Sequence, residues 1–198
     1  MATQKQKRTY SEPFKTTKFR VSYPNVFMPK TDDKGKDWYS IQMIFDKNDP
    51  FVKELVRTVK QVRDQHWGAD YKGILDLGLR DGNEKYNADP EKNHMMKDKI
   101  TLSAKCANKP VVVGRRREAL ISSVEFYGGC YAIAWLKAYT YEDKKSGVAF
   151  GLEGLQKVED GDPFGAGSSI DPMKAFDNLE DGEDSPVDTS DPLGDLMS

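Results

Sequence analysis

The 198-residue sequence predicts a mainly β domain with one long α-helix, followed by an acidic C-terminal tail that remains disordered. Apolar and polar residues alternate in several segments, and one segment repeats its apolar residues at helical spacing. The last forty or so residues are depleted in β-branched and aromatic side chains, so they cannot bury enough surface to fold. We therefore expect a flexible basic arm over residues 1–16, a folded domain over 17–158 and a tail over 159–198.

Two strands are predicted first. Residues 18–28 begin with alternating polarity, and Pro24 confines that strand to an edge, a bulge or a bend. Residues 29–37 form a loop with Gly35 at its turn, and residues 38–45 form the second strand, in which successive side chains point to opposite faces.

The clearest helix covers about residues 50–67. Asp49 is a suitable N-cap, and Pro50 fits the first helical position because its missing N–H is not needed there. The following valines and leucines repeat at helical spacing and give the helix one apolar face. Gly68 is the predicted stop.

The remaining segments end in a predicted β-hairpin. Residues 69–98 are mostly a polar loop, and residues 99–113 return to strand character, with Pro110 as an interruption. The hairpin has arms at 130–141 and 148–158, joined by a turn. Gly151 and Gly154 within its second arm indicate the tight bending that a small barrel requires.

No pattern of catalytic residues is present. The sequence has no phosphate-binding glycine loop and no nucleophile elbow. Its two histidines and two cysteines (His66, His94, Cys106 and Cys130) match no paired-ligand zinc pattern, and adjacent acids such as Asp32 and Asp33 lie in a polar loop. We therefore predict no enzymatic activity, no cofactor and no metal site.

The distribution of charge separates the chain into a basic body and an acidic tail. Residues 158–198 hold twelve acidic residues and one basic residue, a net charge of −11, whereas residues 1–157 hold 29 basic and 20 acidic residues, a net charge of +9. This division indicates a surface that binds a polyanion and a tail that competes for it. The alternative is an ordinary domain with a solubilising tail.

One strand carries the strongest functional pattern. In residues 130–141 the even positions are mostly small, whereas the odd positions are large: Tyr131, Ile133, Trp135, Lys137, Tyr139 and Tyr141. Exposed rings at strand spacing stack on unpaired bases of any sequence, and neighbouring cations meet the phosphates. The alternative for each ring is that it packs beneath the helix.

The predicted nucleic-acid-binding set adds cations and one further ring to this row. Trp38 would be a stacking platform, or alternatively a lid on the core, and the arginines at 115–117 would contact phosphate or simply form an exposed turn. The full set is Lys18, Arg20, Trp38, Lys105, Lys109, Arg115, Arg116, Arg117, Tyr131, Trp135, Lys137 and Tyr139.

The tail contains a loose repeat in which an apolar residue follows Asp-Pro, at 162–164, 171–173 and 191–193. A purely solubilising segment has no need of these apolar residues, so we interpret them as docking points for a partner. The predicted partner-binding residues are Phe164, Phe176, Leu193, Asp195 and Leu196.

Several runs in the sequence resemble bacteriophage single-stranded DNA-binding proteins. They are FRVSYP at 19–24, FYGGCY at 126–131, SGV at 146–148, GLEGLQKV at 151–158 and DGDP at 160–163. The resemblance covers about residues 15–165, and it implies an OB fold, a five-stranded barrel whose open face binds single strands. It also implies that the acidic tail recruits replication proteins.

Two features depart from the resemblance. Tails of this kind often finish in an aromatic residue, whereas this one finishes Asp195-Leu196-Met197-Ser198, which leaves the choice of partner open. The helix also follows the second predicted strand, whereas an OB fold usually places its helix after the third. Either the first strand bends into two, or the barrel is decorated.

The sequence therefore predicts a protein that binds single-stranded DNA without sequence preference in phage replication, recombination or repair. Duplex DNA and RNA remain open as further ligands, because phosphate contacts and stacking do not exclude them. We expect phage or host replication proteins as partners, no membrane association, a monomer or homodimer, and a location in the cytoplasm of the infected bacterial host. A phage nuclease or recombination endonuclease, and a protein–protein adaptor, are the alternatives.

Overall fold

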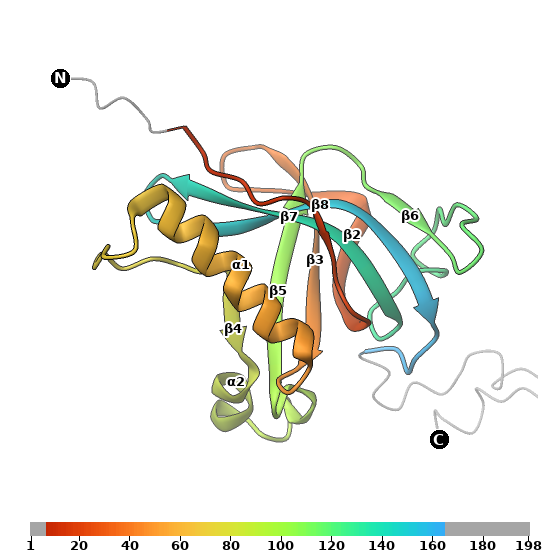
Figure 1. Cartoon of the computed structure of the whole chain (residues 1–198). Helices are drawn as coiled ribbons and strands as arrows, with labels where there is room; N and C mark the ends of the chain where they lie inside the picture. The colour runs from red at the N-terminus through yellow and green to blue at the C-terminus, as the bar shows by residue number, and fades with distance from the viewer. Residues whose placement is uncertain (1–6, 165–198) are drawn as a thin grey trace, which may run out of the picture. The chain divides into compact units, whose positions relative to one another are not determined.

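The computed structural model describes residues 7–164, and within them five strands pair in a closed circuit (Figure 1). In order around the circuit these are β2 (Phe19–Thr31), β3 (Asp37–Asp46), β5 (Lys99–Cys106), β8 (Ser146–Glu159) and β7 (Tyr131–Glu142). β5 and β8 run parallel, the other neighbours run antiparallel, and β7 closes the circuit by pairing with both β8 and β2. The predicted mainly β fold with a five-stranded barrel is confirmed.

The remaining elements decorate this barrel. β1 (Phe14–Lys15) pairs with β7, β4 (Leu79–Asp81) pairs with β5, and β6 (Val111–Val113) pairs with β8. The helices of the described residues are α1 (Pro50–Trp67), α2 (Gly82–Ala88) and a single 3₁₀ turn, η1 (His94–Met96). None of them combines the length and hydrophobicity needed to span a membrane.

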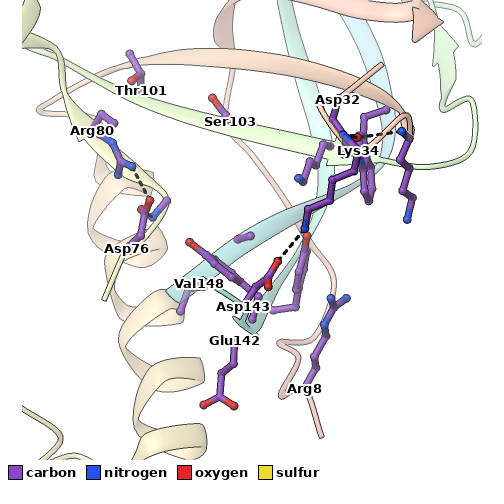
Figure 2. A pocket seen from close by; sticks show the side chains of 17 residues that line it. Arg8, Asp32, Lys34, Asp76, Arg80, Thr101, Ser103, Glu142, Asp143 and Val148 are labelled. Atoms are coloured by element: carbon purple, nitrogen blue, oxygen red, sulfur yellow. Dashed lines mark hydrogen bonds and ion pairs between the residues drawn. The ribbon is translucent and has the colours of Figure 1, made fainter. Parts of the chain in front are cut away.

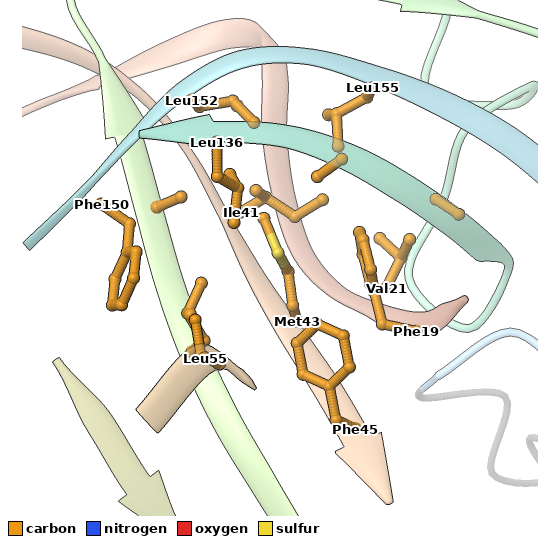
Figure 3. Packing of buried hydrophobic residues seen from close by; sticks show 14 of the residues in the cluster. Phe19, Val21, Ile41, Met43, Phe45, Leu55, Leu136, Phe150, Leu152 and Leu155 are labelled. Atoms are coloured by element: carbon orange, nitrogen blue, oxygen red, sulfur yellow. The ribbon is translucent and has the colours of Figure 1, made fainter. Parts of the chain in front are cut away.

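The barrel interior is filled from all five strands and from α1 (Figure 3). The inward side chains of β7 are small apart from one leucine, as predicted: Ala132, Ala134, Leu136, Ala138 and Thr140 are all buried. Larger residues such as Phe19, Met43, Phe45 and Phe150 fill the space that they leave. The odd-numbered residues of β7 therefore face outward, where they are available for function.

Helix α1 begins and ends where the sequence predicts. The Asp49 carboxylate accepts a hydrogen bond of 2.8 Å from the backbone N–H of Phe51, and Gly68 ends the helix with φ 88°. Its apolar face packs into the barrel, with the Phe51 ring 5.4 Å from that of Phe45. Because α1 lies between β3 and β5, it follows the second barrel strand, so the barrel is decorated and β2 remains one strand.

Loss of the α1 cap should measurably destabilise the domain. Asp49→Ala removes the acceptor for the helix N-terminus and also a 2.9 Å hydrogen bond from the Thr17 hydroxyl. We expect the free energy of unfolding to fall by about 1 kcal/mol in urea denaturation. Asp33→Ala, at an exposed loop position, is the matched control and should leave the unfolding midpoint unchanged.

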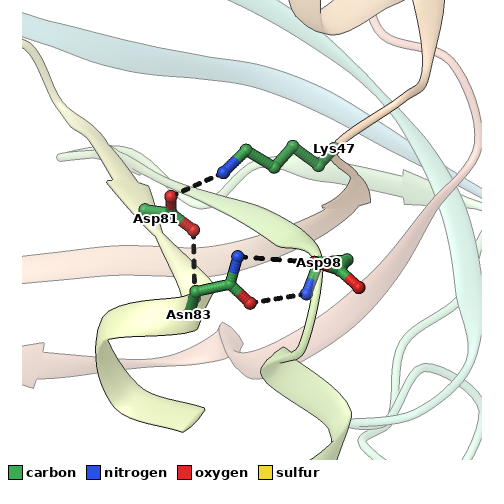
Figure 4. Close-up of polar contacts among 4 residues, drawn as sticks. All are labelled: Lys47, Asp81, Asn83 and Asp98. Atoms are coloured by element: carbon green, nitrogen blue, oxygen red, sulfur yellow. Dashed lines mark hydrogen bonds and ion pairs between the residues drawn. The ribbon is translucent and has the colours of Figure 1, made fainter. Parts of the chain in front are cut away.

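Residues 79–98 differ from the polar loop predicted for this region. Asp81, part of an Asp-Gly turn signal, instead caps α2 by accepting a 3.0 Å hydrogen bond from the N–H of Asn83 (Figure 4). Asp81 also pairs with Lys47 at 2.7 Å, and Asn83 accepts a 2.8 Å hydrogen bond from the N–H of Asp98. These contacts attach α2 to the residue that follows β3 and to the residue that precedes β5, and propensity alone does not reveal them because they join distant segments.

The structure also differs from the flexible arm predicted for residues 1–16, because residues 9–16 form hydrogen bonds along β7. Ser11 and Thr16 donate backbone hydrogen bonds of 2.9 Å to β7 carbonyls, and the Thr9 carbonyl accepts one of 2.9 Å from Thr140. The prediction of a flexible arm is therefore wrong for this stretch. β2 pairs with β7 only at Tyr131 and Ala132, which leaves a long sheet edge that residues 9–16 cover.

Candidate nucleic-acid interface

On the outer face of the β7–β8 hairpin, a row of large side chains on β7 lies beside a row of glycine and alanine residues on β8. Four outward residues of β7 pair across the hairpin with a glycine or alanine of β8. The pairs are Trp135 with Gly154, Lys137 with Gly151, Tyr139 with Ala149, and Tyr141 with Gly147. Directly opposed residues share one face of a sheet, so Trp135 and Lys137 have open space beside them at Gly154 and Gly151, whereas the Asp76 backbone covers Gly147.

Gly151, with Leu152 and Glu153 of β8, lines a groove of about 410 Å³, which we call the basic groove. Its walls come from the N-terminal segment, β3, β5, the β5–β6 loop and β7, and include Arg8, Tyr10, Trp38, Lys105, Lys109, Lys137 and Tyr139. Among its described lining residues, four cations stand against a single carboxylate, Glu153. The groove therefore offers a polyanion both positive charge and aromatic surface.

The rings of the basic groove are each accompanied by a cation. The ammonium groups of Lys36 and Lys105 lie 4.2 and 4.5 Å from the ring centroid of Trp38. The Arg8 guanidinium lies 5.3 Å from the ring of Tyr139. Such pairs are attractive in themselves, and they place positive charge beside each stacking surface. A strand with alternating bases and phosphates matches that arrangement.

Trp38 is held at the groove by its indole N–H, which donates a 2.8 Å hydrogen bond to Asp32. Backbone hydrogen bonding from Lys36, followed by this indole contact, lowers the pKa of the Asp32 carboxyl, so the acceptor stays ionised. The ring is half-buried, and it lines the groove rather than closing the core. Of the two alternatives for Trp38, the groove position is the one observed.

Two ionisable groups in the groove stay neutral at physiological pH. Burial raises the pKa of the Tyr139 phenol, and burial also raises the pKa of the Cys106 thiol to about 11. Neither side chain therefore adds negative charge that would repel a phosphate. The protonated thiol is also a poor nucleophile.

A second groove of about 660 Å³ adjoins the basic groove and shares Arg8, Trp38, Lys105 and Tyr139 with it. Two of its cations form ion pairs (Figure 2): Lys34 lies 3.3 Å from Asp143, and Arg80 lies 2.8 Å from Asp76. The Arg80 hydrogen bond lowers the pKa of the Asp76 carboxyl. The described lining of the second groove holds five cations and four carboxylates, whereas that of the basic groove holds four cations and one carboxylate, so phosphates are attracted more strongly to the basic groove.

Three predicted binding residues lie in a different cluster, where the chain leaves β8. Lys18 pairs with Glu159 at 2.9 Å, and Arg20 donates a 3.0 Å hydrogen bond to the carbonyl of Asp162. The Arg20 guanidinium lies 5.8 Å from the ring of Tyr131 and 4.7 Å from that of Phe164. The structure therefore places Lys18, Arg20 and Tyr131 around residues 159–164 and not in the basic groove.

Phe164 belongs to this cluster rather than to a separate tail. Its backbone N–H donates a 2.8 Å hydrogen bond to the carbonyl of Gly128, and its ring is half-buried. The other residues predicted to bind partners, Phe176, Leu193, Asp195 and Leu196, lie outside the described residues.

The predicted arginine turn is also separate from the basic groove. Arg115 and Arg116 line a hollow of about 440 Å³ whose described walls carry more carboxylates than cations: Glu118, Glu125, Glu159 and Asp160. Arg117 is exposed, with φ 68°. The arrangement fits the alternative of an exposed turn. Nowhere in residues 7–164 do three or more metal-binding side chains gather into a cluster.

Comparison with known proteins identifies the family. Residues 12–186 match the family model described as "Enterobacter phage Enc34, ssDNA-binding protein". The chain belongs to this family. Its similarity extends to a protein of Acyrthosiphon pisum secondary endosymbiont phage 1, "Putative protein p50", which is 27% identical over 182 residues, covering 86% of this chain and 95% of that protein.

Solved structures share the fold of this Enc34-family chain. The single-stranded DNA-binding protein of bacteriophage Enc34, solved in complex with ssDNA, is 24% identical and superposes with a TM-score of 0.62 over 77% of this chain and 89% of its own. The bacteriophage T7 protein gp2.5, also a single-stranded DNA-binding protein, is 17% identical with a TM-score of 0.56, covering 88% of this chain and 98% of its own. At these identities the likeness establishes the fold.

Sequence reasoning missed Arg8 and Tyr10 in this Enc34-family chain. Both lie in the segment predicted to be a flexible arm, yet both line the basic groove, and the Lys137 ammonium lies 5.1 Å from the Tyr10 ring. The only sequence signal for their role is that Tyr10 follows closely on Lys7 and Arg8 in an otherwise polar segment. The groove wall forms because this segment pairs with the edge of β7.

Removing that wall should weaken DNA binding. We expect Arg8→Ala combined with Tyr10→Ala to reduce the affinity for oligo(dT) by about tenfold, through loss of one stacking surface and one phosphate contact. Fluorescence anisotropy measures the change. A matched control, Lys7→Ala combined with Glu12→Ala, should bind within about twofold of the wild type, since both side chains are exposed and neither lines the groove. Equal losses in the two variants would show that the effect lies in the segment's pairing and not in its side chains.

Proposed function

We propose that this chain binds single-stranded DNA without sequence preference and protects it during phage replication, recombination or repair. The observation that carries the proposal is the basic groove, in which partly exposed rings lie beside cations that form no ion pair within residues 7–164. Membership of a family named for ssDNA binding supports it.

The mechanism follows from the two kinds of side chain. Bases lie flat against Trp38, Tyr139 and Tyr10, and each stacked base contributes about 1–3 kcal/mol irrespective of its identity. Lys105, Lys109 and Lys137 neutralise the phosphates between them and release counterions. In a duplex the flat faces of the bases are already stacked on one another, so only the phosphate contacts remain. Unpaired strands are therefore preferred.

A fluorescence titration tests the proposal. Oligo(dT) should quench the intrinsic tryptophan fluorescence and bind more tightly than a duplex of the same length. The affinity should fall with salt at a slope of about −0.7 per phosphate contact on a log–log scale. Absence of quenching and of any mobility shift would leave the protein-adaptor alternative. Incubation of the same complexes with Mg²⁺ tests the nuclease alternative, and we expect the DNA to remain intact.

The acidic tail is proposed to compete with DNA for the basic groove. Residues 165–198 hold nine acidic residues and one basic residue, a net charge of −8, whereas residues 1–164 hold 29 basic and 23 acidic residues, a net charge of +6. DNA bound in the groove would release the tail for phage or host replication proteins in the cytoplasm of the infected cell. Phe176, Leu193, Asp195 and Leu196 are the residues proposed to dock there.

Removing the tail should tighten binding. The cut belongs after Phe164, because residues 159–164 are bonded to the domain through Lys18, Arg20 and Gly128. Deletion of residues 165–198 should raise the affinity for oligo(dT) severalfold at low salt, and the difference should shrink as salt screens the tail. Anisotropy at several salt concentrations measures it. Equal affinities of the two proteins at low salt would refute the competition.

A further inference from the structure

A second aromatic hollow lies beyond the basic groove on the outer face of the barrel. Trp135 of β7, Gly154 of β8 and Val111 of β6 are register partners across three neighbouring strands, so their side chains point to one face. The middle position has no side chain. We call the resulting space the Trp135 hollow; it measures about 260 Å³.

The dimensions of the hollow suit a flat ring. Neighbouring strands are about 4.8 Å apart, which places the backbones of Trp135 and Val111 roughly 10 Å from each other across the glycine. Both walls are accessible to solvent, since Trp135 is 42% exposed and Val111 is 67% exposed. A planar group inserted between them would contact the indole on one side and the valine on the other.

The chemistry of the hollow selects an aromatic group attached to a negative charge. Its remaining walls are mostly apolar, including Val113 and Ile133, and Gln156 supplies the main polar side chain. Such walls recognise the face of a ring rather than its hydrogen-bonding edge. The Lys15 ammonium lies 5.8 Å from the Trp135 ring, where it can meet a phosphate.

Continuity with the basic groove identifies the occupant. Val111 lines both spaces, and Trp135 stands on β7 in the same outward row as Lys137 and Tyr139. A strand that leaves the basic groove along this row reaches the hollow next. We propose that the Trp135 hollow is an end subsite, which takes one unpaired nucleobase of any type from the strand held in the basic groove. This inference rests on the proposed function and adds a second, separable site to it.

The consequence is a dependence of affinity on length. Oligonucleotides that fill only the basic groove should bind without using the hollow, and those long enough to reach it should gain one further stacked base. Since OB folds occupy about 4–16 nucleotides, a series of oligo(dT) lengths across that range should show the gain as a distinct step in affinity.

Two glycines of β8 provide a matched pair of substitutions. A Cβ built at Gly154 would lie 3.6 Å from its nearest neighbour, the Val111 carbonyl oxygen, and one at Gly151 would lie 3.6 Å from the Lys137 carbonyl oxygen. Both are ordinary contacts, and valine is favoured in strands, so the fold should accept either change. Gly154→Val fills the hollow, whereas Gly151→Val fills the basic groove with the same side chain.

The experiment measures the affinity of the full chain and of both variants for the oligo(dT) series. Gly154→Val should bind short oligonucleotides with the affinity of the wild type. For long oligonucleotides its affinity should be about 5- to 150-fold lower than that of the wild type, which is the contribution of one stacked base. Gly151→Val should weaken binding at every length. An abasic position at one end of a long oligonucleotide should lower the affinity of the wild type by the same factor. The same abasic position should not change the affinity of Gly154→Val.

The outcomes separate the subsite from the function itself. If Gly154→Val matches the wild type at every length while Gly151→Val is impaired, the hollow does not bind DNA, and a protein partner becomes its candidate occupant. Equal weakening by Gly154→Val at all lengths would also overturn an end subsite. Failure of the wild type to bind any oligo(dT) would instead overturn the proposed function. Circular dichroism and thermal unfolding establish that both variants fold.

Discussion

Replacing Trp38 by alanine is expected to weaken oligo(dT) binding by about 5- to 150-fold, the largest effect we anticipate for a single ring. Trp38 lines both adjoining grooves, and its indole is the ring that two lysines accompany, at 4.2 and 4.5 Å. The substitution therefore removes a stacking surface and also the group that positions Lys36 and Lys105. Anisotropy titrations at one salt concentration measure the loss.

Tyr23→Ala is the control for Trp38→Ala. Tyr23 is 70% exposed and lines neither groove, so loss of its ring should leave the affinity within about twofold of the wild type. Folding of both variants is compared by thermal unfolding. Equal affinities of Trp38→Ala and Tyr23→Ala would mean that exposed rings in general, and not this one, contribute to binding.

Reversing two charges in the basic groove should reduce both the affinity and its dependence on salt. Lys105→Glu combined with Lys137→Glu removes two of the proposed phosphate contacts and introduces repulsion, so we expect a loss of about tenfold or more per position at low salt. The slope of log affinity against log salt should become shallower by about 1.4, which corresponds to two contacts.

Lys53→Glu combined with Lys60→Glu makes the same change in net charge on the exposed side of α1. This control distinguishes the effect of lost contacts in the basic groove from the electrostatic effect of the protein's net charge. It should lower the affinity only slightly and leave the slope close to that of the wild type. If the two double variants lose affinity equally, long-range charge rather than the basic groove holds the DNA.

Local patterns predicted much of this fold, because they report interactions between near neighbours. Helix α1 is capped by Asp49, begins at Pro50 and ends at Gly68, as the capping signals predict. The alternation along β7 correctly separates its inward and outward faces. The sequence predicts Trp38 and Lys105 separately as binding residues, and the pairing of β3 with β5 places them together. These features needed no knowledge of distant contacts.

The features that sequence reasoning missed depend on distant segments. Tyr131 shares the outward face of β7 with Tyr139, but periodicity does not reveal that Arg20 and residues 159–164 surround Tyr131 at the other end of the strand. The sequence predicts an arm at the N-terminus because the pairing partner of this segment, the uncovered edge of β7, lies over a hundred residues away in the sequence. The sequence predicts Gly151 and Gly154 as bending positions, whereas in the structure they leave open space beside Lys137 and Trp135.

A protein in which Trp38 is the only tryptophan provides the most direct test of the central claim. The chain has three tryptophans, and Trp67→Phe combined with Trp135→Phe leaves Trp38 alone. If unpaired bases stack in the basic groove, oligo(dT) should quench the fluorescence of this variant to saturation, with the affinity measured by anisotropy. Full binding without any change in Trp38 emission would contradict the account, because the strand would then lie elsewhere on the protein.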